Sequence, residues 1–402
     1  MTVAVLRGDA RHLPLPDASV DLIVTSPPYY GLRSYTDGGI HYAGQIGSEA
    51  TPAEWVAALV ECTAEWMRVL KPEGSMFVNL GDKYSGAQQQ THGNQSTETS
   101  AAYWRRTDPK VTGIRAKSLL GLPWRYALAC TDQLGLILRA EIIWAKPNGL
   151  PESVTDRVRR AHEQIFHLVK QPRYYSAVDE IREPHTGNTH GRRSDGQMSP
   201  KESATVDAGH RRGFFPENRE NPLGKLPGSV WQIPSQPLTV PPELGVDHFA
   251  AFPMELPRRI INGWSPPGIC TQCGQGRRPL AETWLGVKER ETPPYGAGNH
   301  GIGKSTLGSR GSGARILGHS CACGIWYDHR QTRPAIVLDP FGGTGTTALL
   351  AHTLGRHGIT IDHSNDYARL AQWRTHDPAE LARALQVDKP PTQINGQEAL
   401  FA

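Results

Sequence analysis

The chain has 402 residues, of which 38% are hydrophobic, and a formal net charge of +4. This length is ample for a sizeable core, either in one large α/β domain with insertions or in roughly two or three domains. No stretch approaches a membrane span, and the first residues lack the pattern of a signal peptide, so we expect a cytoplasmic protein without membrane contact. The mild basic excess permits nucleic-acid binding but does not demonstrate it.

Strand and helix patterns alternate along the first part of the chain. Apolar runs predict strands, and the helical spacing of Trp55, Leu59 and Trp66 predicts an amphipathic helix. In chain order the patterns predict strands over 3–9 and 20–24, a helix over 52–70, a strand over 75–80, a helix over 121–134, and strands over 136–144 and 163–170. This alternation predicts a parallel sheet.

The second part of the chain contains two long stretches with little apolar patterning. Residues 182–228 have few apolar side chains and cannot supply a core of their own, and a glycine-rich stretch spans 274–320. Around them the patterns predict a short helix over 253–261, a strand over 335–339, a helix over 348–354, a strand over 358–362 and a helix over 366–374. We therefore predict an α/β fold with a twisted, mostly parallel sheet, helices on both faces and loop insertions.

A proline-rich turn, Thr25-Ser26-Pro27-Pro28-Tyr29, follows the strand predicted at 20–24. Two prolines cannot continue the strand, so the turn presents its side chains at the carboxyl end of the sheet, where α/β proteins bind ligands. The Ser26 hydroxyl and the Pro27 carbonyl can hold both N–H groups of an exocyclic base amine, and Tyr29 can stack on a base that has flipped out of a duplex. The alternative is an ordinary Pro-Pro turn that closes a strand.

A glycine-rich turn, Asp339-Pro340-Phe341-Gly342-Gly343-Thr344-Gly345-Thr346, joins a predicted strand to a predicted helix. Glycines allow close backbone approach to a ligand, and Asp362 ends the next strand, where an acid typically binds ribose hydroxyls. The spacing departs from the dinucleotide fingerprint and no lysine follows the glycines, so we expect a cofactor without a pyrophosphate, namely S-adenosylmethionine. The alternative is a turn that only packs the helix on the strand.

Residues 298–305 match the phosphate-loop pattern letter for letter. That loop requires a strand before it and a helix after it, and neither flank fits here. We therefore do not assign nucleotide hydrolysis to this stretch.

Four of the six cysteines form two close pairs, Cys270 with Cys273 and Cys321 with Cys323. A long chain without a secretion signal favours thiols or metal over disulfides, and two such knuckles can supply four thiolates to a structural zinc. His319 is a possible substitute ligand, and free thiols are the alternative.

Together these motifs resemble the DNA amino-methyltransferases that modify cytosine N4 or adenine N6. The turn at Ser26 resembles their catalytic motif, the turn at Asp339 resembles their cofactor motif, and the order is the permuted one of the beta group. The resemblance implies catalytic roles for Ser26, Pro27, Pro28 and Tyr29. It implies cofactor contacts by Asp9, Thr25, Phe252, Pro253, Asp339, Pro340, Phe341, Gly342, Gly343, Thr344, Gly345, Thr346 and Asp362, the segment from His248 to Pro253 being similar to the one that packs over the methionine moiety.

This interpretation also divides the chain, with a cysteine-bearing insertion that departs from the minimal pattern of the family. We expect a catalytic half over 1–175, a target-recognition insertion over 176–228, a cofactor-packing segment over 229–267, a zinc-knuckle insertion over 268–325, a cofactor-binding half over 326–376 and a tail over 377–402. The basic run from Arg105 to Lys117 is either a solvated loop or a loop that faces the DNA backbone.

The expected function is site-specific methylation of duplex DNA at cytosine N4, since in this family serine at the position of Ser26 goes mostly with cytosine. Adenine N6 is the first alternative. More distant alternatives are an RNA or protein methyltransferase, and a non-enzymatic zinc-containing DNA-binding module. A cognate restriction nuclease is a possible partner, and the sequence does not indicate the oligomeric state.

Overall fold

The computed structural model describes residues 3–31, 36–37, 40–41, 44–86, 113–149, 151–184, 221, 223–246, 252–284, 313–323 and 331–388. Its contacts divide the chain into two compact units. The larger unit comprises Met1–Ala177, Gly228–Arg278 and Ser320–Ala402, and the smaller comprises Val178–Pro227 and Pro279–His319. The motifs at Ser26 and Asp339 and the four paired cysteines all belong to the larger unit.

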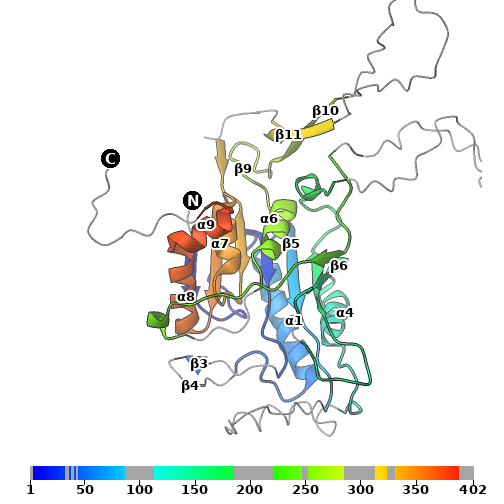
Figure 1. Cartoon of the computed structure of the whole chain (residues 1–402). Coiled ribbons are helices and arrows are strands. Elements are labelled where there is room, and N and C mark those ends of the chain that lie inside the picture. Colours follow the sequence, from blue (N-terminus) through cyan, green and yellow to red (C-terminus); the bar gives the residue numbers. More distant parts are fainter. Residues whose placement is uncertain are drawn as a thin grey trace, which may run out of the picture. The chain divides into compact units, whose positions relative to one another are not determined.

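The larger unit is built on one sheet, with β5 near its middle and β6 near one edge (Figure 1). Among the described residues its eight strands follow the order β1-β14-β13-β2-β5-β7-β6-β8. From β1 to β5 each neighbouring pair is parallel, and β7 is antiparallel to both β5 and β6. The predicted α/β fold with a mostly parallel sheet is thus confirmed. The strands are β1 (Val3–Arg7), β2 (Val20–Thr25), β5 (Leu70–Leu80), β6 (Ile137–Ala145), β7 (His162–Val169), β8 (Val230–Gln232), β13 (Ile336–Asp339) and β14 (His357–Asp362).

The strand directions decide which residues meet at the ligand-binding edge of the sheet. The parallel strands β1, β14, β13, β2 and β5 all end there, whereas β7 begins there because it runs the opposite way. The register places Gln164 of β7 opposite Leu80 at the end of β5, and Glu163 opposite Trp144 near the end of β6. The first residues of β7 therefore lie beside the last residues of its neighbours.

Helices cover both faces of the sheet: α1 (Pro52–Val69), α4 (Leu122–Leu134), α6 (Glu255–Trp264), α7 (Thr346–Thr353), α8 (Asn365–His376) and α9 (Pro378–Leu385). Alternate residues of β5 show the two faces. Met76 and Val78 belong to the hydrophobic cluster that includes Trp55 and Trp66 of α1. Phe77 points the other way, with its ring centroid 4.7 Å from that of Trp264 of α6. Both tryptophans of α1 are fully buried, as their core assignment predicts.

Local sequence explains where α1 begins and ends. The Thr51 side chain accepts a hydrogen bond from the Glu54 backbone, the Glu54 side chain accepts one from the Thr51 backbone, and Pro52 occupies the first turn. The helix stops where Leu70 turns to extended backbone. Strand β5 then starts immediately, so residues 71–74, between the predicted helix and the predicted strand, lie within the strand and not in a separate loop.

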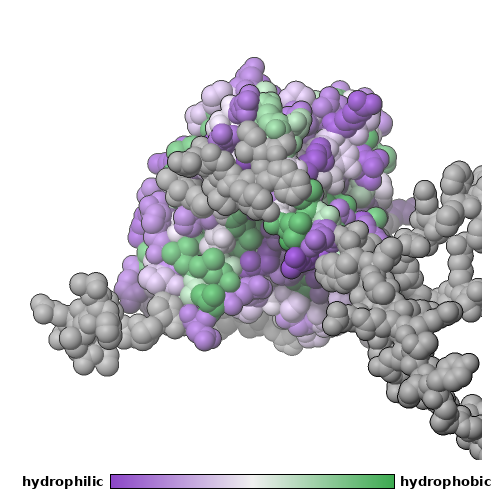
Figure 2. Space-filling model, turned by 90° about the horizontal axis from the view of Figure 1, so that it is seen from above, coloured by the Kyte–Doolittle hydropathy of each residue, from purple (hydrophilic) through white to green (hydrophobic). Residues whose placement is uncertain are grey.

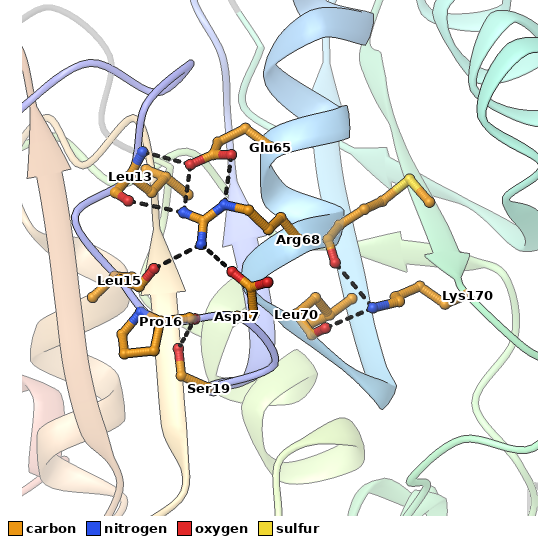
Figure 3. A network of polar contacts seen from close by, with 10 residues as sticks. Leu13, Leu15, Pro16, Asp17, Ser19, Glu65, Arg68, Leu70 and Lys170 are labelled. Carbon is orange, nitrogen blue, oxygen red and sulfur yellow. Dashed lines mark hydrogen bonds and ion pairs between the residues drawn. The ribbon is translucent and has the colours of Figure 1, made fainter.

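Arg68, in the last turn of α1, fastens the segment that leads from β1 to β2 (Figure 3). Its guanidinium donates to the backbone oxygens of Leu13 at 3.0 Å and Leu15 at 2.9 Å, and it pairs with Glu65 and Asp17. The Glu65 carboxylate in turn accepts from the Leu13 backbone N–H at 2.8 Å. Since this segment includes Asp9, the network holds one side of the predicted cofactor site.

The end of the chain holds more structure than its pattern indicates. Residues 378–385, which the sequence patterns leave unassigned, form α9, capped by the Asp377 carboxylate through the backbone N–H groups of Ala379 and Glu380. Glu380 then pairs with Arg374 of α8 at 2.9 Å, and both side chains are buried. A capped helix of two turns is too short for periodicity to reveal it.

The remaining elements are short. They are β3 (Thr36–Asp37), β4 (Ile40–His41), β9 (Ile269–Cys270), β12 (Thr332–Arg333), the 3₁₀ helices η1 (Val178–Ile181) and η2 (Pro242–Leu244), and the paired strands β10 (Arg278–Trp284) and β11 (Gly313–Ser320). Among the described residues, no helix is both long and apolar enough to cross a membrane. The surface that Figure 2 shows is a mosaic in which hydrophobic patches are small and separated by hydrophilic residues.

Candidate active site

A pocket lies at the carboxyl ends of β1, β14, β13 and β2. It encloses about 1010 Å³ of space, including its mouth to solvent. Most of the residues expected to contact a cofactor line it: Asp9, Phe252, Asp339, Pro340, Phe341, Gly342, Gly343, Thr344, Thr346 and Asp362. The catalytic-motif residues Ser26 and Pro28 line it as well, so the structure brings the two motifs to one cavity.

The glycine turn after β13 has no room for a side chain at Gly342. A Cβ on Gly342 would lie 1.7 Å from Thr360 Oγ1, and Gly345 adopts φ +73° where it caps α7. The backbone N–H of Gly343 donates to Asp362 Oδ2 at 2.9 Å, which ties the turn to the end of β14. The turn is thereby held in one conformation under the pocket.

Asp339 is the most perturbed acid of the pocket. It is 2% exposed, and its carboxylate accepts from the Thr347 hydroxyl at 2.9 Å and from the Phe341 backbone at 3.1 Å. Burial raises the pKa of Asp339 to about 7, in spite of these hydrogen bonds. Among the described residues, none forms an ion pair with this carboxylate, and a cationic ligand would supply the compensating positive charge.

Two further acids stand at neighbouring strand ends. The Asp9 carboxylate is held by the Arg11 guanidinium at 2.7 Å, and hydrogen bonding from Arg11 lowers the pKa of Asp9. Asp362 accepts backbone N–H groups with both oxygens, from Gly343 and from Ser364. Both carboxylates are therefore fixed in position at the pocket wall.

The hydroxyls of Thr344 and Thr346 are already occupied by protein. The buried Arg374 donates to them at 2.6 and 2.7 Å, and the two hydroxyls lie 3.1 Å apart. Arg374 thus holds both threonines in place, and their side chains help to fix the glycine turn that lines the pocket.

Next to the pocket, the catalytic turn joins a polar cluster. Tyr29 Oη donates to Glu163 Oε2 at 2.6 Å and lies 3.3 Å from Ser26 Oγ. The amide nitrogen of Asn79 lies 2.8 Å from Glu163 Oε2, 2.9 Å from Tyr29 Oη and 3.4 Å from Ser26 Oγ. Lys146 makes a short ion pair with the other oxygen of Glu163 and lies over the ring of Trp144.

Packing fixes the catalytic turn from two sides. The indole N–H of Trp55 donates to the Pro28 carbonyl at 3.0 Å. A Cβ on Gly81 would lie 2.7 Å from Tyr29 Cε2, so only glycine accommodates the tyrosine ring there. Among the described residues, none donates a hydrogen bond to the Pro27 carbonyl, which stays available as an acceptor.

Other predicted residues lie close to the pocket but do not line it. Thr25 and Pro253 are buried, Gly345 caps α7, and Pro27 and Tyr29 belong to the turn and its polar cluster. Residues 247–251, which include His248, lie outside the described residues. So do the phosphate-loop match at 298–305, much of the expected target-recognition insertion, and Arg105, Arg106 and Lys110 of the basic run.

Sequence reasoning did not assign a site role to Asn79, Lys146 and Glu163. Asn79 precedes the last residue of β5, and Lys146 follows β6, so the ends of predicted strands signal both positions. Glu163 is different because it stands at the start of a strand. Only the antiparallel direction of β7 brings it to this edge.

The four paired cysteines form one cluster in the larger unit. The sulfur atoms of Cys270, Cys273, Cys321 and Cys323 all lie within 4.8 Å of one another. The first pair sits on a knuckle in which the Gly274 N–H donates to the Cys270 carbonyl at 2.9 Å and Gly274 adopts φ +71°. His319, the possible substitute ligand, pairs instead with Glu180 at 2.7 Å.

Comparison with known proteins gives a consistent result. The model of a family described as DNA methylase, comprising N6 and N4 methyltransferases, matches residues 20–270 and 332–373. The chain is 30% identical over 373 residues to the type II methyltransferase M.SmaI of Serratia marcescens, covering 92% of this chain and 89% of that protein. It is 35% identical over 266 residues to the type II methyltransferase M.XycI of Xanthomonas campestris pv. cyanopsidis, covering 66% of this chain and 73% of the relative.

The fold is also found among solved structures. The cytosine-N4-specific PvuII DNA methyltransferase aligns with a TM-score of 0.50 and 16% identity, covering 96% of this chain and 94% of that one. At this identity the likeness concerns the fold alone. The sequence matches establish the enzyme class, and this chain belongs to the family of DNA methylases that modify the N6 amine of adenine or the N4 amine of cytosine.

Proposed function

We propose that this enzyme transfers a methyl group from S-adenosylmethionine to the N4 amine of cytosine in duplex DNA. The observation that carries the proposal is the position of Ser26, which lines the pocket beside Asp339 and also joins the polar cluster at Tyr29. A base amine held at Ser26 would face whatever occupies the pocket.

The pocket fits S-adenosylmethionine by its chemistry. Asp9, Asp339 and Asp362 supply carboxylates for a ligand that carries an ammonium, a sulfonium and ribose hydroxyls, and Phe252 and Phe341 supply aromatic surface. The buried Asp339, with its raised pKa, is the acid that gains most from a cation. When bound, S-adenosylmethionine supplies a methyl group whose C–S bond breaks with the electron pair remaining on sulfur as the N–C bond forms.

The chain's own residues then orient the amine. Its lone pair is delocalised into the base ring, and two acceptors that hold both N–H groups turn the nitrogen toward a tetrahedral shape. The Ser26 hydroxyl and the Pro27 carbonyl are these acceptors, and the Tyr29 ring, fixed by its hydroxyl and by Gly81, contacts the base. Much of the rate enhancement comes from such positioning.

DNA binding requires basic side chains near this edge and a flipped base. Arg157 and Arg159 stand in the segment between β6 and β7, which begins at Lys146 and ends shortly before Glu163 of β7. We assign backbone contacts to this segment and sequence recognition to the insertion at 176–228. Since the relatives are named type II methyltransferases, we further propose a restriction nuclease that recognises the same site.

We also propose that the cysteine cluster binds one structural zinc ion. Four thiolates around Zn²⁺ place their sulfurs about 3.8 Å apart, and the four sulfurs of the cluster all lie within 4.8 Å of one another. Elemental analysis of the purified protein should find about one zinc per chain, and Cys273→Ser should lose it. Absence of metal from wild-type protein purified without chelator would overturn this assignment.

Nucleoside mass spectrometry tests the main proposal. Duplex DNA treated with the protein and S-adenosylmethionine should contain N4-methylcytosine, and sequencing of the methylated DNA should map the site. Ser26→Ala should lose methylation while keeping cofactor affinity by calorimetry. N6-methyladenine would overturn the base assignment but keep the mechanism, and methylation of RNA in preference to DNA would overturn the substrate class.

A further inference from the structure

Glu163 is the anionic end of the polar cluster that begins at Ser26. Among the described residues that contact this cluster, it alone carries a carboxylate, since Asn79 ends in an amide. One Glu163 oxygen takes the Tyr29 hydroxyl and the Asn79 amide, and the other takes Lys146. The Glu163 side chain is 15% exposed, so it keeps limited contact with solvent.

The hydrogen-bond directions in the cluster follow from its donors. A carboxylate only accepts, so the 2.6 Å contact is a hydrogen bond from the Tyr29 hydroxyl to Glu163. Asn79 has two amide hydrogens for three oxygens, and its contact with Ser26, at 3.4 Å, is the longest. The Ser26 hydroxyl can therefore donate to the Tyr29 oxygen while its own lone pairs face the pocket.

We propose that Glu163 is the terminal acceptor of the proton that the target amine loses, reached through the hydroxyls of Ser26 and Tyr29. This inference rests on the proposed function. After the new N–C bond forms, the nitrogen carries a positive charge and gives one proton to Ser26 Oγ. Ser26 passes its own proton to Tyr29, and Tyr29 passes its own to Glu163 Oε2. Both hydroxyls end as they began, and Glu163 becomes a carboxylic acid that later releases the proton to water.

A purely structural role for Glu163 and a role as proton acceptor predict different methyl-transfer rates for the following variants. Glu163→Gln keeps an oxygen that accepts a hydrogen bond from Tyr29 but takes up no proton. It therefore separates the holding of Tyr29 from the uptake of a proton. Tyr29→Phe keeps the ring but removes the hydroxyl in the middle of the path. Glu163→Asp keeps a carboxylate on a shorter side chain. Glu61→Gln, on the exposed side of α1, is the matched control.

The experiment measures single-turnover methyl transfer, cofactor affinity and base flipping in parallel. Flipping is followed by the fluorescence of a duplex that carries 2-aminopurine in place of the target base, a readout that needs no methyl transfer. We expect Glu163→Gln and Tyr29→Phe each to slow transfer about 100-fold, in the range of general acid–base catalysis. The double variant should be no more than about threefold slower than either, because the residues act as one path. Cofactor affinity and fluorescence should stay within about twofold.

Each other outcome overturns the proposal. A Glu163→Gln rate within about threefold of wild type means that no proton goes to this residue. Losses that multiply in the double variant mean that Tyr29 and Glu163 act independently. Loss of the 2-aminopurine signal, or an aspartate variant no faster than the glutamine one, means that Glu163 acts through structure alone. The product formed by wild type tests the proposed function separately, since the variant ratios apply to either base.

Discussion

Asp339 offers a test of whether the cofactor pocket is built at the expense of stability. In Asp339→Asn the amide oxygen can accept from the Phe341 backbone, and the amide nitrogen can donate to the Thr347 hydroxyl, which also lies 3.2 Å from the Val24 carbonyl. The substitution therefore preserves shape and hydrogen bonds while removing an acid whose pKa burial raises to about 7.

The expected magnitude follows from proton linkage. An unfolded aspartate ionises near pH 3.8, whereas folded Asp339 holds its proton to about pH 7. Between these pH values the folded state holds a proton that the unfolded state has lost. The contribution of this protonation to the free energy of unfolding is therefore complete below pH 3.8 and is lost as the pH rises to 7. The difference of about three units between the pKa of folded and unfolded Asp339 corresponds to about 4 kcal/mol of the free energy of unfolding. About 2 kcal/mol of this is lost between pH 5.5 and pH 8.

Urea unfolding at pH 5.5 and pH 8 measures this term. The free energy of unfolding of Asp339→Asn, relative to that of wild type, should rise by about 2 kcal/mol from pH 5.5 to pH 8. Asp132→Asn, on the exposed side of α4, should track wild type at both. A difference between Asp339→Asn and wild type that is equal at the two pH values would refute the reasoning. In the same window, calorimetry should find that wild type binds S-adenosylmethionine more tightly as pH rises, while the variant shows no such trend.

Three further substitutions test the supports of the site. Gly81→Ala should slow methyl transfer at least about tenfold without changing cofactor affinity, because its Cβ would lie 2.7 Å from the Tyr29 ring; single-turnover rates and calorimetry check this. Trp55→Phe should lower the free energy of unfolding, measured in urea, by about 1–3 kcal/mol, since it leaves the Pro28 carbonyl without its indole donor. Arg374→Met should lower the free energy of unfolding by about 3–5 kcal/mol, because the buried Glu380 carboxylate then loses its ion pair with Arg374. A lower melting temperature should show this loss.

The parts of the fold that sequence predicts well are those determined locally. Helix α1 was expected over 52–70 and spans Pro52–Val69, because its cap, its apolar spacing and its stop all lie within the segment. The strands that carry the two motifs are likewise short, mostly apolar runs. The glycine turn after β13 was predictable for the same reason, since its glycines indicate the backbone geometry that they permit.

The parts that sequence does not predict depend on contacts between distant segments. Strand β8 has a single buried residue, Trp231, and exists because it pairs with β6. The position of Glu163 depends on the direction of β7, which no residue within 162–169 encodes. Arg374 meets Thr344 and Thr346 only after α8 has packed beside the glycine turn. The position of Glu163 in the polar cluster and the contacts of Arg374 with the glycine turn thus depend on the topology of the fold.

The sheet also explains why the order of the motifs along the chain leaves the chemistry unaffected. Ser26 and Asp339 are far apart in sequence, yet β2 and β13 are parallel neighbours, with Leu22 beside Val337 and Ile23 beside Leu338. Continuing this register brings the ends of both strands to the same pocket. A chain that placed the cofactor motif first would pair the same strands and present the same side chains. The connections between these elements accommodate long insertions, such as the segments 178–227 and 279–319 that form the smaller unit.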